Sequence, residues 1–265
     1  MATTLPHPFS DPTIGIVHGA WHNPTHYSGL TTSLQALGHE VLIRTLPFMN
    51  GTRPPTADLH TDTEHIRNYV KSIERRRPQY YYINALLWRL GWNKCISRAW
   101  RDQSTESKSS WWGSAAGIHV RARPGRGVIH VQDRCSCRAA TVLARCAHYR
   151  EDRMVEYRHF RDEMIGPRFA EAEVEAYGAA LKSRNRKDMY QKLRAAAWRD
   201  ISVSYMVTMW DGLFHLAYQT AMIEGMRAAG REVERFEWET GHCPHVTTTK
   251  GVMEIMHTIM CREAK

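Results

Sequence analysis

Short apolar runs alternate with segments of helical periodicity along the first part of the chain. The run Thr13–Val17 contains no charge and ends at the glycine-containing loop His18–His22, which is typical of a buried parallel strand. Tyr27–Leu37 has the apolar spacing of a helix, with Gly38 as its expected C-cap, and Glu40–Pro47 predicts a second strand. This order indicates the beginning of a doubly wound, mostly parallel sheet.

The pattern loses its regularity after the next helix, which we expect over about residues 60–75. Tyr80–Ile83 can begin the third strand, but residues 84–120 show no steady period, and residues 104–110 are polar and low in complexity. We therefore predict that the central segment, about residues 80–148, is irregular or poorly ordered.

Regular patterns return near Glu151. Helical composition over residues 170–181 and 188–198 predicts a small helical cap within about residues 151–200. The remaining expected elements alternate between strand and helix: strand 201–207, helix 215–229, strand 232–238 and helix 246–260. With the N-terminal elements they predict one α/β domain over residues 1–265, an ordinary length for a single domain.

The irregular segment also holds the whole basic excess of the chain. Residues 75–150 contain fifteen Lys and Arg against three Asp and Glu, whereas the entire chain has a formal net charge of +9. Thirteen of those fifteen cations are Arg, and five of the nine Trp lie in the same block. A nucleic-acid-binding patch is one interpretation of this composition.

Nothing in the pattern indicates export or membrane insertion. No run of about 18 apolar residues occurs, and residues 1–12 lack the basic-then-apolar order of a signal peptide. The six cysteines have no tightly paired spacing. We therefore expect reduced thiols, no contact with a membrane and a cytoplasmic location.

Polar side chains with catalytic potential follow three of the predicted strands. In open α/β sheets, ligands bind outside the carboxyl ends of the strands. The loop His18–His22 follows the first strand, Asp211 follows the strand at 201–207, and His242 follows the strand at 232–238. An Asp after one late strand and a His after the next is the chain order of the acid and the base in α/β-hydrolases.

Four short segments strengthen this comparison, and together they resemble a fungal branch of the α/β-hydrolase family. They are His18-Gly19-Ala20-Trp21-His22, Ala36–Val41, Pro54–Asp58 and Thr240–Pro244. Plant methylesterases and hydroxynitrile lyases are more distant relatives in this resemblance, which covers about residues 12–78 and 151–262. It implies an α/β-hydrolase-type sheet and the esterase-like hydrolysis of a small or medium carboxylic ester, such as a secondary metabolite, without a cofactor. Hydroxynitrile lyase chemistry is also compatible with it.

The same resemblance implies a Ser-Asp-His triad. His242 is then the general base, and Asp211 orients its ring and stabilises the imidazolium. His245 competes with His242 for the role of base, but the Gly-His pair fits the family pattern better.

The first strand-end loop supplies the binding groups that the resemblance implies. The backbone N–H of Ala20 is expected to bind the oxyanion of the tetrahedral intermediate, and Trp21 is expected to shape the pocket. His18 and Gly19 belong to the same oxyanion and substrate-binding loop.

The nucleophile of such a triad is missing from its expected place. The third strand should end in G-x-S-x-G, whose tight turn exposes the serine hydroxyl, and no such motif occurs. A one-base shift of the reading frame explains the absence, because each Trp codon then becomes a glycine codon. In that frame Asn84–Arg89 can be read as Met-His-Ser-Tyr-Gly-Gly, which places the serine at the position of Leu86. We therefore interpret about residues 79–148 as frame-shifted and the chain as written as inactive.

Other interpretations stay open. The chain is alternatively a non-catalytic protein on the same scaffold, whose Arg-rich segment binds an acidic partner; nucleic acid is disfavoured, because no recognised nucleic-acid module is present. No metal site is expected, because Cys135-Ser136-Cys137 with His148 lacks a second ligand pair. Cys243 beside His242 is expected to be a small buried thiol rather than a nucleophile.

Sequencing the genomic DNA and the transcript across residues 79–148 tests the frame-shift interpretation. We expect the +1 frame of this segment to stay open and to encode a glycine-flanked serine near Leu86, because the glycine codons are forced by the Trp codons. The interpretation is wrong if both nucleic acids confirm the printed frame and the +1 frame contains an early stop.

Overall fold

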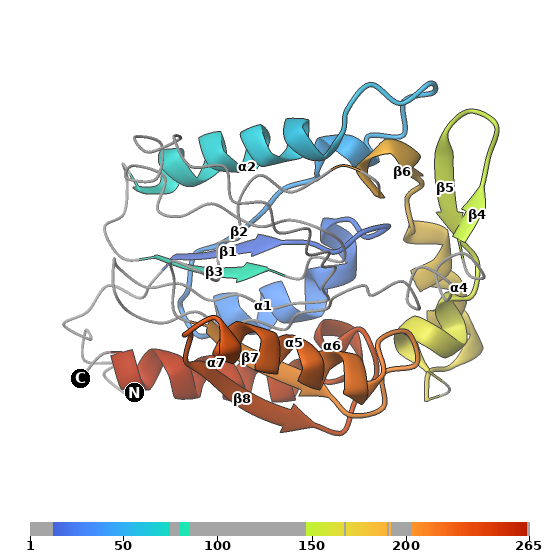
Figure 1. The fold of residues 1–265 in the computed structure, drawn as a ribbon. Coiled ribbons are helices and arrows are strands. Elements are labelled where there is room, and N and C mark those ends of the chain that lie inside the picture. Colours follow the sequence, from blue (N-terminus) through green and yellow to red (C-terminus); the bar gives the residue numbers. More distant parts are fainter. Residues whose placement is uncertain are drawn as a thin grey trace, which may run out of the picture.

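A strand that is buried along its whole length, β1 (Thr13–Val17), lies at the centre of a parallel sheet. It pairs with β2 (Val41–Ile43) on one side and with β3 (Tyr80–Asn84) on the other (Figure 1). The last residues of β1 and β3, Val17 and Asn84, pair with each other, so both strands leave the sheet at the same edge. The computed structural model describes residues 13–74, 80–84, 147–166, 168–189, 191 and 203–263.

Helices cover both faces of this sheet, as the uncharged sequence of β1 predicts. α2 (Leu59–Glu74) lies on one face and α1 (Ser28–Ala36) on the other (Figure 1). α1 buries Leu30 and Leu34 in a core that it shares with β1 and with α7 (Thr249–Glu263). The apolar faces of two helices thus close one side of the strand that precedes the candidate loop.

A second parallel pair carries the C-terminal part of the chain. β7 (Val203–Thr208) pairs in register with β8 (Val233–Trp238), and every residue of β7 is buried. Met206 packs into the core of α1 and α7. On the opposite face, alternate β7 residues pack against α5 (Leu216–Ala228): Val203, Tyr205 and Val207. β7 is therefore covered by helices on both faces, which is the doubly wound arrangement that was expected.

In chain order, a mixed cap lies between β3 and β7; it contains α4 within the region expected to form a small helical cap, about residues 151–200, and strands that were not expected. β4 (Ala147–Tyr149), β5 (Met154–Tyr157) and β6 (Arg184–Asn185) form an antiparallel sheet in the order β4-β5-β6. Within the described part of this region, α4 (Glu171–Ala180) is the only α-helix. The cap lies at the edge where β1 and β3 end (Figure 1).

The central strand of the cap sheet buries most of its apolar side chains. Met154, Val155 and Tyr157 of β5 are buried, and Arg153, at φ 67°, makes the tight turn from β4. The helix expected over residues 188–198 is replaced at its start by the 3-10 helix Arg186–Met189. The remainder of that expected helix lies outside the described residues, apart from residue 191.

Short helical turns complete the connections. They are the 3-10 helices Pro24–Tyr27 and Pro47–Met49, the π-helical turn Arg161–Ile165 and α6 (Pro244–Thr247). Among the helices of the described ranges, none combines the length and the apolar character that a membrane crossing requires.

The central segment, expected to be irregular over about residues 80–148, begins with the strand that Tyr80–Ile83 was expected to start and ends in a second strand that was not expected. The tyrosine run forms β3, because aromatic residues favour strands and the run gains a full ladder with β1. Residues 147–149 form β4, and residues 85–146, with the rest of that expectation, lie outside the described residues. The C-cap of α1 is Leu37, and the predicted terminator Gly38 lies one residue further, at a φ of 92° that glycine adopts without strain.

A matched pair of leucine substitutions tests this core. Leu30→Ala removes a fully buried side chain from the core of α1, β1 and α7, so we expect the free energy of unfolding to fall by about 3 kcal/mol. Leu37 is 55% exposed, and Leu37→Ala should change that free energy by less than about 0.5 kcal/mol. Urea denaturation measures both; equal effects of the two substitutions would contradict the described packing.

Candidate active site

The ends of β7 and β8 bring Asp211 and His242 together. Two backbone hydrogen bonds tie the chain after β7 to the chain after β8: Met209 N donates to Trp238 O at 2.9 Å, and Trp210 N donates to Thr240 O at 3.0 Å. Because the strands are parallel and in register, both catalytic candidates emerge at the same edge.

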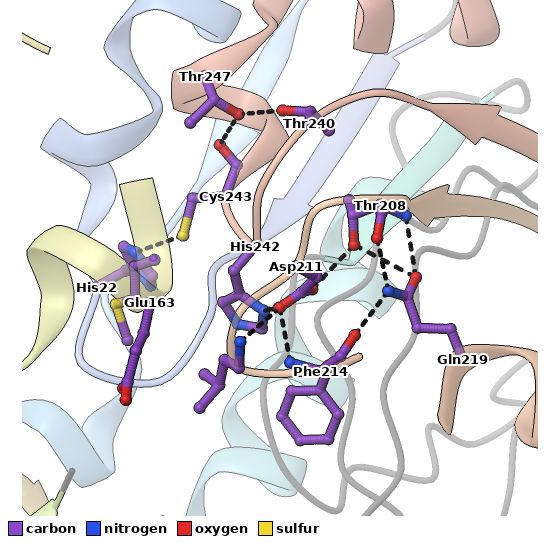
Figure 2. A network of polar contacts seen from close by, with 12 residues as sticks. His22, Glu163, Thr208, Asp211, Phe214, Gln219, Thr240, His242, Cys243 and Thr247 are labelled. Carbon is purple, nitrogen blue, oxygen red and sulfur yellow. Dashed lines mark hydrogen bonds and ion pairs between the residues drawn. The ribbon is translucent and has the colours of Figure 1, made fainter. Parts of the chain in front are cut away.

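The imidazole of His242 faces the carboxylate of Asp211 directly (Figure 2). His242 Nδ1 lies 2.9 Å from Asp211 Oδ2 and 3.1 Å from Asp211 Oδ1. Both residues are buried, with exposures of 1% for His242 and 4% for Asp211. In this orientation Nδ1–H donates to the carboxylate and the tautomer leaves a lone pair on Nε2.

The Asp211 carboxylate is held in place by three further donors. Thr208 Oγ1 donates to Oδ2 at 2.9 Å, and the backbone N–H groups of Leu213 and Phe214 donate to Oδ1 at 3.0 and 2.6 Å. A buried carboxylate needs such partners, because an ion without them is costly to remove from water. The turn after β7 is therefore built around this side chain.

Gln219 of α5 locks that turn to the end of β7 (Figure 2). Its Oε1 accepts from Thr208 N at 2.9 Å, and its Nε2 donates to Thr208 O at 2.8 Å and to Phe214 O at 2.7 Å. Sequence reasoning missed Thr208 and Gln219. The only sequence signal for either is position: a hydroxyl three residues before Asp211 and an amide in the first turn of the following helix.

The other ring nitrogen of His242 has no hydrogen-bond partner in the part of the chain that the structure describes. His242 Nε2 is buried, and the Phe214 ring lies near the imidazole with ring centroids 5.8 Å apart. A histidine with Nδ1 held by an acid and Nε2 unused has the arrangement that a general base requires.

His245, the competing base, is placed elsewhere. Its ring stacks on Tyr27 with centroids 4.0 Å apart and an interplanar angle of 5°, whereas the Asp211 carboxylate contacts His242. The neighbouring thiol of Cys243 is buried, and burial raises its pKa to about 12. A thiol with so high a pKa is a poor nucleophile, in line with the expectation of a small buried side chain.

The loop after β1 is held by its own buried side chains. His18 Nε2 accepts from Leu46 N at 3.1 Å, and His18 Nδ1 lies 3.0 Å from Gly19 O, so both ring nitrogens are engaged by the backbone. Gly19 N donates to the Tyr27 hydroxyl at 2.9 Å. Within the described residues, the N–H of Ala20 has no such partner. The amide of Gly19 is therefore engaged, whereas the amides of Ala20 and Trp21 have no hydrogen-bond partner within the described residues.

Trp21 joins the loop to the cap in a strained backbone conformation. Its φ is 62°, a left-handed value that a residue with a large side chain adopts only when surrounding contacts fix it. Trp21 Nε1 donates to Val155 O at 3.1 Å, Lys182 N donates to Trp21 O at 2.7 Å, and the side chain is fully buried. These contacts fix the backbone at Trp21, and with it the peptide that joins Ala20 to Trp21.

A buried charged group supports Trp21 from the cap side. The Arg184 guanidinium lies 4.9 Å from the centroid of the Trp21 ring and forms an ion pair with Asp188. Burial raises the pKa of the nearby Asp62 to about 8 and lowers the pKa of Arg184 to about 9. Asp62 also accepts from Phe48 N at 2.9 Å. None of these charged residues was identified from the sequence, because the hydrophobic pattern of a sequence does not show which charged side chains become buried.

The position expected for the nucleophile, near Leu86, lies outside the described residues. The described part of β3 ends at Asn84, which pairs with Val17, and the predicted binding loop begins one residue after Val17.

Comparison with solved structures places this arrangement in a known fold. An extracellular α/β-hydrolase from a Paenibacillus species is 12% identical, with a TM-score of 0.63 over 94% of this chain and 98% of that chain. A methylesterase from Arabidopsis is 14% identical, with a TM-score of 0.60 over 94% and 99% of the two chains. A pyrethroid hydrolase from Sphingobium faniae JZ-2 is 17% identical, with a TM-score of 0.54 over 94% and 96%. The chain therefore has the α/β-hydrolase fold. No family model and no curated protein matches its sequence.

Histidine titration by NMR tests the tautomer and the burial of His18. Burial lowers the pKa of His18 to about 4, so we expect its imidazole to stay neutral, with the proton on Nδ1, down to about pH 5. Because this value lies below the unfolded pKa of about 6.5, the contribution of His18 to stability is complete above pH 6.5 and is lost as the pH falls toward 4. A His18 midpoint near pH 6.5 would contradict the described environment.

Proposed function

We propose that this chain carries the acid–base half of an ester-hydrolysing site of the Ser-Asp-His type. The observation that supports it is the buried Asp211–His242 pair, with Nδ1 held by the carboxylate and Nε2 left without a partner among the described residues. In such a site Nε2 takes the proton of the attacking hydroxyl and later delivers it to the leaving alcohol. Asp211 keeps the required tautomer and stabilises the imidazolium between these steps.

The loop after β1 supplies the proposed oxyanion donor. Gly19 N is engaged by Tyr27, whereas the N–H of Ala20 is available and is held still by the buried, strained Trp21 beside it. A preorganised backbone donor of this kind stabilises the negative charge of a tetrahedral intermediate without reorganisation. Trp21 then forms one wall of the acyl pocket.

The proposed substrate is a small or medium carboxylic ester. Solved structures with the same fold include a methylesterase and a polyneuridine aldehyde esterase, and these names support ester hydrolysis as the reaction for which the scaffold is built. The mixed cap contacts the binding loop through Val155 and Lys182. It is therefore the element that we expect to select the acyl or alcohol group.

The attacking serine is absent from the chain as written, and we propose that serine-dependent hydrolysis is lost with it. No G-x-S-x-G occurs anywhere in the sequence, so no serine is held in the strained turn that presents its hydroxyl to a histidine. The frame-shift interpretation of residues 79–148 accounts for this loss. On that interpretation the flanks keep the base, the acid and the oxyanion loop of an esterase, while the intervening codons no longer encode its nucleophile.

Restoring the reading frame tests the proposal. We expect the chain as written to hydrolyse p-nitrophenyl acetate at the background rate, and a chain whose residues 79–148 are translated in the +1 frame to hydrolyse it. In the restored chain His242→Ala should lower kcat by at least about 10³-fold, because the general base is then lost. His257→Ala changes an exposed histidine of α7 and is the matched control, which should keep the activity.

Two results would contradict the proposal. One is hydrolysis by the chain as written that His242→Ala abolishes, since a nucleophile is then already present. The other is a restored chain that folds, as judged by circular dichroism, but does not hydrolyse any p-nitrophenyl ester from acetate to octanoate.

A further inference from the structure

A second cluster of polar side chains lies on the far side of the His242 loop from Asp211. It consists of His22, from the loop after β1, and Cys243 and His245, from the loop and short helix after β8. One donor atom from each residue lies within 4.8 Å of the others, and all three residues are buried. Figure 2 shows the His22 ring directed at the Cys243 sulfur, away from the Asp211–His242 pair.

We infer that His22, Cys243 and His245 bind a borderline-soft divalent cation of the zinc class. Zinc in proteins takes histidine nitrogens at about 2.0–2.1 Å and cysteine sulfur at about 2.3 Å in a tetrahedral arrangement, which separates a nitrogen from a sulfur by about 3.5 Å. His22 Nε2 lies 3.7 Å from Cys243 Sγ. The two donors therefore already have nearly the spacing that one shared metal ion imposes.

The imidazoles of the cluster have donor capacity that the described residues do not use. His22 Nδ1 and His245 Nε2 are buried without a hydrogen-bond partner in the described ranges. An ordinary buried histidine satisfies both nitrogens, as His18 does with Leu46 and Gly19. A cation bound through His245 Nε2 would use one of these unpartnered nitrogens, whereas binding through His22 Nε2 would replace the hydrogen bond that this atom makes with the Tyr177 hydroxyl.

Burial keeps these rings in the form that binds metal. It lowers the pKa values of His22 and His245 well below the usual range, and the neighbouring histidines His18, His26 and His242 add to the effect. Both rings are therefore neutral at pH 7, as ligation requires. The Cys243 thiol is protonated in the metal-free chain, so binding of M²⁺ forms the Cys243 S–M bond and releases the thiol proton to solvent.

Tyr177 of α4 engages the cluster by hydrogen bonds in the metal-free chain. Its hydroxyl lies 2.6 Å from His22 Nε2 and 3.4 Å from Cys243 Sγ, and it is also 3.4 Å from the Met164 sulfur. Zinc in proteins is almost always four-coordinate, so one further ligand would complete the three donors named here. The ion would tie the loop after β1 to the loop after β8, while His242 stays paired with Asp211.

This inference does not depend on the esterase proposal, because it involves neither a nucleophile nor a reaction. It also replaces the expectation, drawn from spacing alone, that the chain has no metal site. His22 and Cys243 are 221 residues apart in sequence, and Cys243 and His245 are 2 apart. No short sequence motif could therefore reveal the three donors together.

Cobalt titration of the reduced full-length chain tests the inference. We expect one equivalent of Co²⁺ to produce the near-ultraviolet absorption of a thiolate–cobalt bond and the visible bands of a tetrahedral site, both of which Zn²⁺ displaces. Cys243→Ser should abolish the thiolate band and raise the Kd for Co²⁺ by at least about 100-fold, since loss of a supporting group alone costs 10- to 100-fold.

Two controls identify which thiol is bound. Cys261→Ser removes an exposed cysteine whose sulfur lies 3.5 Å from His257 Nε2, and it should leave the titration unchanged. A chain with serine at all four cysteines of the central segment (Cys95, Cys135, Cys137 and Cys146) should likewise keep the band. His245→Gln provides a second ligand variant if circular dichroism shows that Cys243→Ser does not fold.

Thermal unfolding gives a readout that does not depend on the spectrum. Zinc should raise the unfolding temperature of the unmodified chain and of Cys261→Ser, but not that of Cys243→Ser or His245→Gln, because only a folded state with the site intact binds the ion. The inference is overturned if folded Cys243→Ser and His245→Gln bind Co²⁺ like the unmodified chain, or if the unmodified chain binds no Co²⁺ at all.

Discussion

The buried carboxylate of Asp211 is the group on which the rest of the site depends. It accepts hydrogen bonds from the Thr208 hydroxyl, from the backbone N–H groups of Leu213 and Phe214, and from His242 Nδ1. An ionised carboxylate is costly to bury, and this cost is offset only when all of these donors converge on it. The register of β7 with β8, the turn after β7 and the placement of Gln219 are the means by which the chain achieves that convergence.

The elements that position this carboxylate and its partner lie in the C-terminal part of the chain. β7 is covered by α5 on one face and by α1 and α7 on the other, so the acid and the base are positioned by elements outside residues 85–146. The loop after β1 is fixed by His18, Tyr27 and the cap contacts of Trp21. The Asp211–His242 pair and the loop after β1 are therefore each held in place by contacts among the described residues.

Much of this architecture could be predicted from residue patterns, and the reasons are local. An uncharged apolar run such as Thr13–Val17 is typical of a strand covered on both faces. Gly38 favours the end of a helix because glycine adopts the left-handed backbone conformation without steric strain. Asp211 and His242 were predicted because parallel strands bring their carboxyl ends together. What could not be predicted depends on contacts distant in sequence: the strands of the cap, the bond from Gln219 to Thr208, and the meeting of His22 with Cys243.

The Nδ1–H of His242 is the most direct probe of the account, because a proton held between an imidazole and a buried carboxylate resonates far downfield in the ¹H NMR spectrum. The account predicts such a resonance in the chain as written, its loss in Asp211→Asn and its persistence in Asp62→Asn, which changes a buried carboxyl elsewhere. A folded chain without this resonance, or one in which it survives Asp211→Asn, would show that β7 and β8 do not build the acid–base pair described here.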